Sequence, residues 1–269
     1  MTAVLRLVCV SALVAWDGAA AQEVFQPRSG QAGKDVVWVP TPPELVEKML
    51  DMAEVTPTDV VMDLGSGDGR NIIAAARRGA KAIGVEFNPE MVELSRKLAQ
   101  EAGVAEKATF VEGDMYEADV SGASVLALFL LPTNLERLRD KFLAMTPGSR
   151  IVLNTFKIEA WEPDATEEVA GCTAWCTAYL VIVPARVEGA WTVDGGGELR
   201  LTQKFQVVTG SATTAGGNVE ISTGRLRGDQ IALTVGDTQY SGRVRGDRIE
   251  GTATTGTRQR SWTATRARP

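Results

Sequence analysis

Hydrophobic residues in the first two thirds of the chain fall into short apolar runs separated by longer amphipathic segments. The runs are bounded by Gly, Pro, Asn or Asp, as buried strands are, and the segments between them have apolar positions at helical spacing. This β/α alternation predicts an α/β fold with a doubly wound, Rossmann-like sheet of seven strands. The predicted strands are 59–64, 81–86, 109–112, 124–131 and 150–156, and the predicted helices are 71–78, 88–103 and 134–145.

Both ends of this α/β region have less regular patterns. Residues 36–40 form an apolar run, and Thr41-Pro42-Pro43 predicts the start of a helix that continues to about residue 54, with Thr41 as the capping residue. The run 178–187 is interrupted by Pro184, which indicates a bent strand or a hairpin at the sheet edge.

The pattern changes after Gly189 to Gly, Thr, Arg and alternating apolar residues. Gly224-Arg-Leu-Arg-Gly-Asp-Gln-Ile is repeated as Gly242-Arg-Val-Arg-Gly-Asp-Arg-Ile, and each copy predicts a hairpin with a Gly-Asp turn. We expect about five short strands in a small antiparallel meander or barrel, with Trp191 and Trp262 in its core. The predicted domains are therefore 22–188 and 189–269.

The first 21 residues have the order of a secretory signal peptide. Arg6 precedes the apolar run 7–15, and Ala19-Ala20-Ala21 precedes Gln22. The run is too short to span a bilayer. The sequence therefore predicts export to the periplasm or the medium, with no stable membrane span.

Charge and residue usage exclude several classes of function. Residues 22–188 have 16 basic and 26 acidic side chains, whereas residues 189–269 have 11 and 7. The acidic first part argues against a nucleic-acid substrate and is compatible with a cationic one. The absence of histidine excludes a Ser-His-Asp hydrolase and a histidine base, and zinc would lack ligands, so no metal site is expected. Cys172 and Cys176 could form a disulfide across a turn or remain two buried thiols.

The segment from Val60 to Arg70 is a strand that runs into a glycine-rich turn and then a helix. Such a turn commonly holds a nucleotide-like ligand. Its glycines follow the pattern G-x-G-x-G, and Asp63 and Asp68 beside them would repel a diphosphate. Carboxylates suit S-adenosylmethionine (SAM), which has a sulfonium and an ammonium group and no phosphate. The predicted loop contacts are Asp63, Gly65, Ser66, Gly67, Asp68 and Gly69.

Polar residues after the next two strands extend this predicted cofactor site. Glu86 ends the second strand, where a carboxylate can accept hydrogen bonds from both ribose hydroxyls, and Asn88 follows it. Asp114 follows the third strand and could accept a hydrogen bond from the adenine amino group, with Met115 packed on the ring. Each carboxylate alone could be an ordinary exposed side chain, but the spacing of both after the loop favours a SAM site.

These motifs resemble class I SAM-dependent methyltransferases over about residues 36–187. Four segments, Val39-Pro-Thr-Pro, the loop from Asp63, Gly84-Val-Glu-Phe-Asn-Pro and Phe129-Leu-Leu-Pro, resemble the mitochondrial lysine methyltransferases that act on the c-type ring protein of ATP synthase and on the adenine nucleotide translocase. The resemblance implies that Asp63, Gly65, Gly67 and Glu86 contact the cofactor and that Pro40 and Thr41 help to cover it. It does not extend to the β domain.

The methyl acceptor is less well defined by the sequence. A neutral amine needs no strong base, whereas an oxygen acceptor would need one that no motif provides, so an amine on a protein lysine or a small molecule is favoured. The candidate acceptor pocket is Phe129, Leu130, Leu131, Pro132 and Asn134.

The sequence leaves other functions open. They are a small-molecule N- or O-methyltransferase, a non-catalytic SAM-binding protein that acts through its β domain, and a dinucleotide-dependent oxidoreductase, which the acidic loop disfavours. Export would also separate the protein from its cytoplasmic SAM supply. Either SAM reaches that compartment, or the N-terminus is an uncleaved anchor, or the site binds another ligand.

Overall fold

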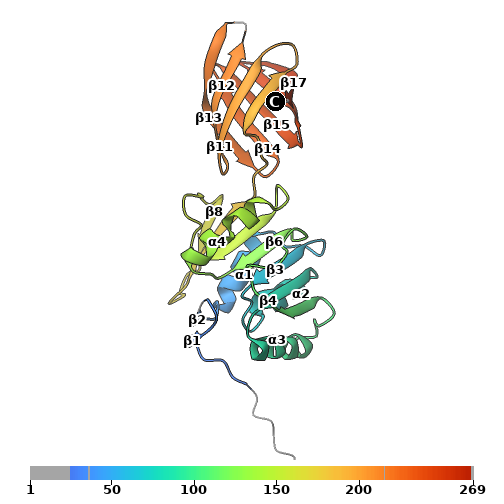
Figure 1. The fold of residues 1–269 in the computed structure, drawn as a ribbon, viewed down its shortest axis with the longest axis vertical. Helices are drawn as coiled ribbons and strands as arrows, with labels where there is room; N and C mark the ends of the chain where they lie inside the picture. The colour runs from blue at the N-terminus through green and yellow to red at the C-terminus, as the bar shows by residue number, and fades with distance from the viewer. Residues whose placement is uncertain (1–24, 36, 215, 268–269) are drawn as a thin grey trace, which may run out of the picture.

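The computed structural model describes residues 25–35, 37–214 and 216–267. It contains an α/β part with a seven-stranded sheet and a closed β-barrel, which are stacked along the long axis of the molecule (Figure 1). The predicted fold class is confirmed. The predicted signal peptide, residues 1–21, and Val36 of the first apolar run lie outside the described residues.

The seven-stranded sheet is mostly parallel. Its strand order is β5-β4-β3-β6-β7-β9-β8, and the first five strands in this order are parallel to one another. β9 is antiparallel to both β7 and β8. The predicted edge element, residues 178–187, contains only this one strand, which ends before Pro184, and its hairpin partner β8 comes from outside that run. The strands are β3 (Val60–Leu64), β4 (Lys81–Glu86), β5 (Ala108–Glu112), β6 (Val125–Leu128), β7 (Arg150–Asn154), β8 (Ala165–Glu168) and β9 (Thr177–Ile182).

Helices cover both faces of this sheet. One hydrophobic cluster joins α1, α2 and α3 to one face through buried residues such as Leu45, Ile72 and Val92. A second cluster joins α4 to the other face through Leu135 and Phe142. The helices are α1 (Pro43–Met52), α2 (Arg70–Arg77), α3 (Pro89–Glu101) and α4 (Pro132–Leu143).

The starts of two helices test the capping predictions. Asn88 caps α3, because its side-chain oxygen accepts from the backbone N–H groups of Glu90 and Met91. Thr41 does not cap α1: Pro42 is the N-cap, and no side chain caps that end. Thr41 is instead buried, and its hydroxyl accepts a hydrogen bond from the Asn154 amide at 3.2 Å. The prediction for Thr41 as a cap was therefore wrong.

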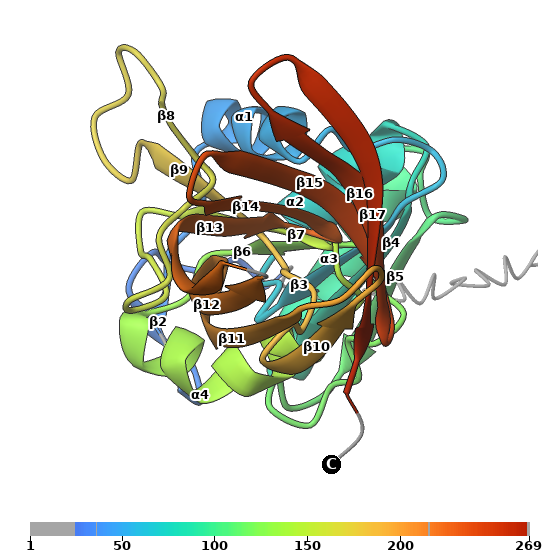
Figure 2. The same cartoon turned by 90° about the horizontal axis from the view of Figure 1, so that it is seen from above.

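The C-terminal barrel has eight antiparallel strands, and the prediction of about five was wrong. Each strand pairs with the next, and the first pairs with the last (Figure 2). Register shifts between Val207 and Ser211 and between Ile221 and Thr223 break the two-residue alternation, so long strands look shorter in the sequence. The strands are β10 (Gly189–Val193), β11 (Glu198–Lys204), β12 (Val207–Thr214), β13 (Gly217–Arg227), β14 (Gln230–Val235), β15 (Thr238–Arg245), β16 (Arg248–Thr255) and β17 (Arg258–Arg266).

Other expectations for the barrel are confirmed. Both repeats form hairpins with two-residue Gly-Asp turns, and their glycines, Gly228 and Gly246, have φ values of 61° and 59°. Trp191 and Trp262 are buried in the barrel core, on the two strands that close the barrel.

The barrel contacts the α/β part through the segment that follows β7. The rings of Trp161 and Phe205 stack with centroids 5.0 Å apart. The Gln206 amide donates to the Glu162 carbonyl oxygen at 2.6 Å, and Arg225 forms an ion pair with Asp164 at 3.1 Å. These contacts fix the barrel against the loop that leads to β8. Within the described residues, no helix is both long enough and apolar enough to span a membrane.

A substitution of the buried Trp191 tests how much the barrel core contributes to the stability of the protein. Trp191→Ala should lower the free energy of unfolding by about 3–5 kcal/mol, because it leaves a large cavity in the barrel core. Urea denaturation would measure this loss. Val207→Ala is the matched control, because Val207 is 44% exposed and its substitution should lower the free energy of unfolding only slightly. A similar loss in both variants would contradict this account of the core.

Candidate functional site

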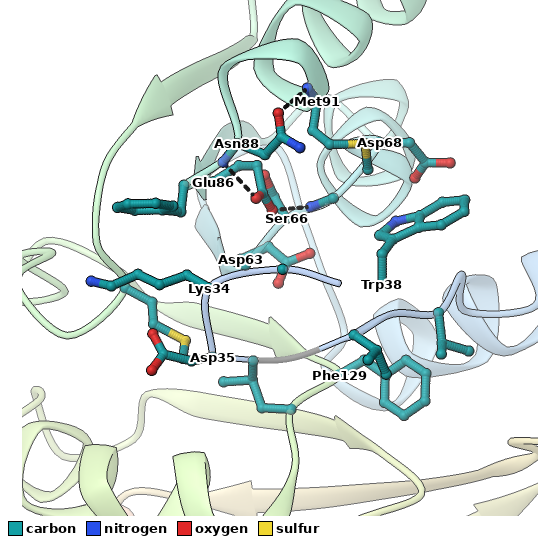
Figure 3. Close-up of a pocket in the computed structure, with 18 of the residues that line it drawn as sticks. Lys34, Asp35, Trp38, Asp63, Ser66, Asp68, Glu86, Asn88, Met91 and Phe129 are labelled. Atoms are coloured by element: carbon teal, nitrogen blue, oxygen red, sulfur yellow. Dashed lines mark hydrogen bonds between the residues drawn. The ribbon is translucent and has the colours of Figure 1, made fainter. Parts of the chain in front are cut away.

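A cavity opens where β3 and β4 end, and the N-terminal segment runs across it (Figure 3). The ends of parallel strands are the usual ligand site in open α/β sheets. The loops after β3, β4, β5 and β6 all contribute lining residues. The predicted residues that line it are Pro40, Thr41, Asp63, Gly65, Ser66, Gly67, Asp68, Glu86, Asn88, Asp114, Met115, Phe129, Leu130 and Leu131.

Three predicted site residues are not among those that line the cavity. Gly69 is the N-cap of α2 and lies against Phe110. Pro132 begins α4. Asn134 is buried, and its amide donates to the Tyr116 hydroxyl at 2.7 Å.

Left-handed glycines shape the loop between β3 and α2. Gly65, Gly67 and Gly69 have φ values of 76°, 56° and 80°, which side chains other than glycine rarely adopt. A Cβ at Gly69 would lie 2.5 Å from the Phe110 ring, and one at Gly67 would lie 2.5 Å from the Trp38 indole nitrogen. The loop therefore needs glycine for its conformation and for the space that its neighbours occupy.

Glu86 holds this loop to the end of β4. One oxygen of its carboxylate accepts from the Gly67 backbone N–H at 2.9 Å, and the other accepts from the Asn88 backbone N–H at 2.9 Å. Figure 3 shows both hydrogen bonds. Each carboxylate oxygen keeps acceptor capacity, which fits the predicted role of binding ribose hydroxyls.

Asp63 is a buried carboxyl group with one side-chain partner. Burial raises its pKa to about 8, against the lowering effect of the Asn71 amide, which donates to it at 2.9 Å; the nearby Glu86 and Asp68 carboxylates raise the pKa further. Near neutral pH this group is therefore largely protonated until a cation approaches it.

Two other carboxylates at the cavity already have cationic partners. Arg70 forms an ion pair with Asp68 at 2.6 Å and also donates to the Thr41 carbonyl oxygen at 2.7 Å. Lys34 forms an ion pair with Asp114 at 2.5 Å, and its ammonium lies 4.7 Å from the centre of the Phe87 ring. The hydrogen bond from Lys34 and another from the Tyr116 backbone N–H lower the pKa of Asp114.

The N-terminal segment covers part of the cavity. It contains the small hairpin of β1 (Gln31–Ala32) and β2 (Val37–Trp38), and Lys34 and Trp38 both line the cavity. The sequence predicted that Pro40 and Thr41 would cover the site, but not Lys34 or Trp38. Nothing in the local pattern marks these two, because only the folded segment brings them to the cavity.

Phe129 lies across the cavity from Glu86 and Asn88, and Asp35 also lies away from these two residues (Figure 3). Leu130 is almost fully buried, whereas Leu131 is 40% exposed. Phe156 and Trp175 also line the cavity, and neither was among the site residues predicted from the sequence. Phe156 follows β7 at the same edge of the sheet, a signal that could have identified it. Trp175 comes from the loop between β8 and β9, whose position only the fold reveals.

The residues around the loop fit SAM. Gly65 leaves open space towards the cavity, because a Cβ there would meet only the Leu130 side chain at 3.5 Å. Asp63 and Glu86 form none of the ion pairs found among the described residues, so this end of the cavity can accept the positive charge of the cofactor. A pyrophosphate would face these same carboxylates, which disfavours a dinucleotide.

Comparisons with known proteins agree with this assignment. Residues 63–165 match a family model described as the ANTKMT methyltransferase domain. A protein-lysine N-methyltransferase of Saccharolobus islandicus is 38% identical over 151 residues, which are 55% of this chain and 94% of that protein. The mouse adenine nucleotide translocase lysine N-methyltransferase is 36% identical over 122 residues, but the match covers only 45% of this chain and 53% of that enzyme.

A solved structure shows the same fold with a bound product of the cofactor. It is described as an RNA methyltransferase from Salinibacter ruber in complex with S-adenosyl-L-homocysteine (SAH). It is 44% identical, covers 55% of this chain and 96% of its own, and superposes with a TM-score of 0.52.

The fold and the cofactor loop together define a class I SAM-dependent methyltransferase, an enzyme whose cofactor is SAM. Within that class, the chain belongs to the family of protein-lysine N-methyltransferases represented by the archaeal and mouse relatives.

Gly69 tests the conformation of the loop. Gly69→Ala should lower the free energy of unfolding by about 2–4 kcal/mol and weaken SAH binding, because it adds left-handed backbone strain and a clash with buried Phe110. Thermal unfolding and calorimetric titration with SAH would measure both effects. Gly122→Ala is the control, because Gly122 has no positive φ and open space around it. Equal behaviour of the two variants would argue against the required left-handed turn.

Asp63 should link cofactor binding to pH. A carboxyl with a raised pKa must lose its proton to pair with a cation, so SAM affinity should increase as pH rises from 6 towards about 8. SAM binding at pH 7 should release close to one proton, visible as a heat that depends on the buffer's ionisation enthalpy. Asp63→Asn should bind without that proton release. A heat for the unmodified protein that is the same in all buffers would exclude this linkage.

Proposed function

We propose that this protein transfers the methyl group of SAM to the ε-amine of a lysine in a polypeptide. The observation that carries the proposal is one cavity with two contrasting sides. The carboxyl groups of Asp63 on β3 and Glu86 on β4 lie on one side, and the apolar ring of Phe129 lies on the other, with the Phe156 ring beside it. Relatives named as protein-lysine N-methyltransferases support the same acceptor.

The chemistry requires little from the protein beyond position. The acceptor nitrogen forms a bond to the methyl carbon as the carbon–sulfur bond breaks, and the cofactor leaves as SAH. The nitrogen takes on the positive charge that the sulfonium loses, so the product is a methylammonium, which has to lose a proton only before a further methyl transfer. Holding the two groups in line supplies much of the rate enhancement.

The acceptor must lose a proton before it can attack. A lysine ammonium has a pKa near 10.4 in water, and apolar surroundings lower that pKa because they disfavour the charged form. Leu130 provides such surroundings, since it lines the cavity and is 2% exposed. The apolar side of the cavity therefore favours the reactive neutral amine without a histidine base.

The charge of the α/β part supports a polypeptide acceptor over RNA. Residues 22–188 have a net charge of −10, which repels a phosphate backbone. The Salinibacter ruber structure is nevertheless described as an RNA methyltransferase, so RNA is the alternative that the experiment has to include.

Label transfer from methyl-tritiated SAM would test the acceptor class directly. The acceptor pools would be lysine-containing peptides, the same peptides with arginine in place of lysine, total RNA, and free amines. We expect label only in the lysine peptides, recovered after acid hydrolysis as ε-N-methyl-lysine. Glu86→Ala should abolish transfer, because it removes the carboxylate that holds Gly67 and Asn88.

The pools distinguish the competing functions. Label in RNA or only in free amines would contradict the proposal and indicate a nucleic-acid or small-molecule methyltransferase. SAH binding without transfer to any pool would favour a non-catalytic protein that acts through its barrel.

A further inference from the structure

Three aromatic rings meet on the acceptor side of the cavity. The ring centres of Phe129 and Trp175 are 5.5 Å apart, those of Phe156 and Trp175 are 5.9 Å apart, and those of Phe129 and Phe156 are 6.2 Å apart. They come from three segments: the end of β6, the residues after β7, and the loop between β8 and β9. We call Phe129, Phe156 and Trp175 the aromatic wall.

Two of these rings, those of Phe156 and Trp175, lie at or next to a residue with a strained backbone conformation. Thr155, next to Phe156, has a φ of 60°, and the Phe156 N–H donates to the Asn154 carbonyl oxygen at 2.6 Å, which forms a tight three-residue turn. Trp175 itself has a φ of 58°. Such conformations cost about 1–3 kcal/mol each and are concentrated at functional sites. Two of the five positive-φ residues other than glycine among the described residues therefore lie at this one cluster of rings.

A disulfide also holds the Trp175 ring in place. Cys172 and Cys176 are bonded and close a five-residue loop that contains Trp175. Trp175 is 40% exposed, so packing against its neighbours restrains its side chain only in part. The disulfide limits the movement of this loop and thereby keeps the indole beside Phe129 and Phe156.

Exposure increases from Leu130 towards Trp175. Leu130 is buried, Phe129 and Phe156 are half-buried, and Trp175 is exposed. The aromatic wall therefore lies at the mouth of the cavity, where an acceptor arrives still charged. A cation gains about 0.5–2 kcal/mol over an aromatic face, and methylation of an ammonium does not remove its charge.

We propose that the aromatic wall is the docking site for the alkylammonium group of the acceptor, and that the Cys172–Cys176 disulfide acts by positioning Trp175. This inference rests on the proposed function. It adds the residues that would favour a positively charged acceptor group over a neutral one. Trp175 is thus a specificity residue at the entrance, separate from the carboxylates that bind the cofactor.

Choline and its neutral isostere 3,3-dimethylbutan-1-ol provide the test, because they have nearly the same shape and differ in charge. The SAH-saturated protein and its variants would be titrated with each ligand by calorimetry, and in the unmodified protein with ¹⁵N-labelled tryptophan the indole signal of Trp175 would show where the ligand binds. We expect choline to bind about fivefold more tightly than the alcohol. Trp175→Leu should remove this preference, and Trp175→Phe should keep most of it. Both variants should bind SAH as the unmodified protein does.

The double substitution Cys172→Ser with Cys176→Ser tests the positioning role. It should weaken choline binding as Trp175→Leu does and leave SAH binding unchanged. Unchanged choline affinity would overturn the role of the disulfide. Equal affinities for choline and the alcohol, with SAH bound, would overturn the aromatic docking site alone. Absence of SAH binding by the folded protein would overturn the proposed function and this inference with it.

Discussion

The cofactor site depends on how one carboxylate joins two loops. Glu86 accepts hydrogen bonds from the backbone of Gly67 and of Asn88, and so connects the glycine loop to the start of α3. The backbone N–H groups of Gly65 and Ser66 also both donate to the Val85 carbonyl oxygen. The parallel pairing of β3 with β4 makes this possible, because it brings the ends of the two strands together. The left-handed turn and the carboxylate that is predicted to bind the ribose therefore form one unit.

The sequence predicted the parallel strands and the helices of the α/β fold well because these elements have strong local signals. The edge strand β8 was not predicted, because its four residues are all exposed and form no apolar run. Apolar runs end in glycine or asparagine, and Asn88 caps its helix as predicted. The barrel was harder to predict from sequence. Its strands are long but contain register shifts at β12 and β13, and Gly210 lies where a Cβ would meet the Arg200 carbonyl oxygen at 1.9 Å. Such positions break the alternation by which strands are counted, so the pattern suggests fewer and shorter strands.

The residues of the site also differ in how far the sequence alone could identify them. Asp63, Gly67 and Glu86 belong to a spacing that the sequence displays directly. Lys34 and Trp175 do not, because one reaches the cavity through the N-terminal segment and the other through a disulfide-closed loop far along the chain. Asn134 shows the opposite error: its sequence position suggested the acceptor pocket, but the helix that contains it directs the amide to Tyr116.

The ion pairs around the cavity indicate which carboxyl groups can attract a cationic group of the cofactor. Arg70 already neutralises Asp68, and Lys34 already neutralises Asp114. Asp63 and Glu86 are the neighbouring carboxylates left to share a positive charge, and their mutual repulsion contributes to the raised pKa of Asp63. A cation between them would relieve that repulsion, whereas a phosphate would increase it. The acidic neighbours of the glycine loop therefore favour a ligand that places a cationic group, such as an ammonium, beside Asp63 and Glu86.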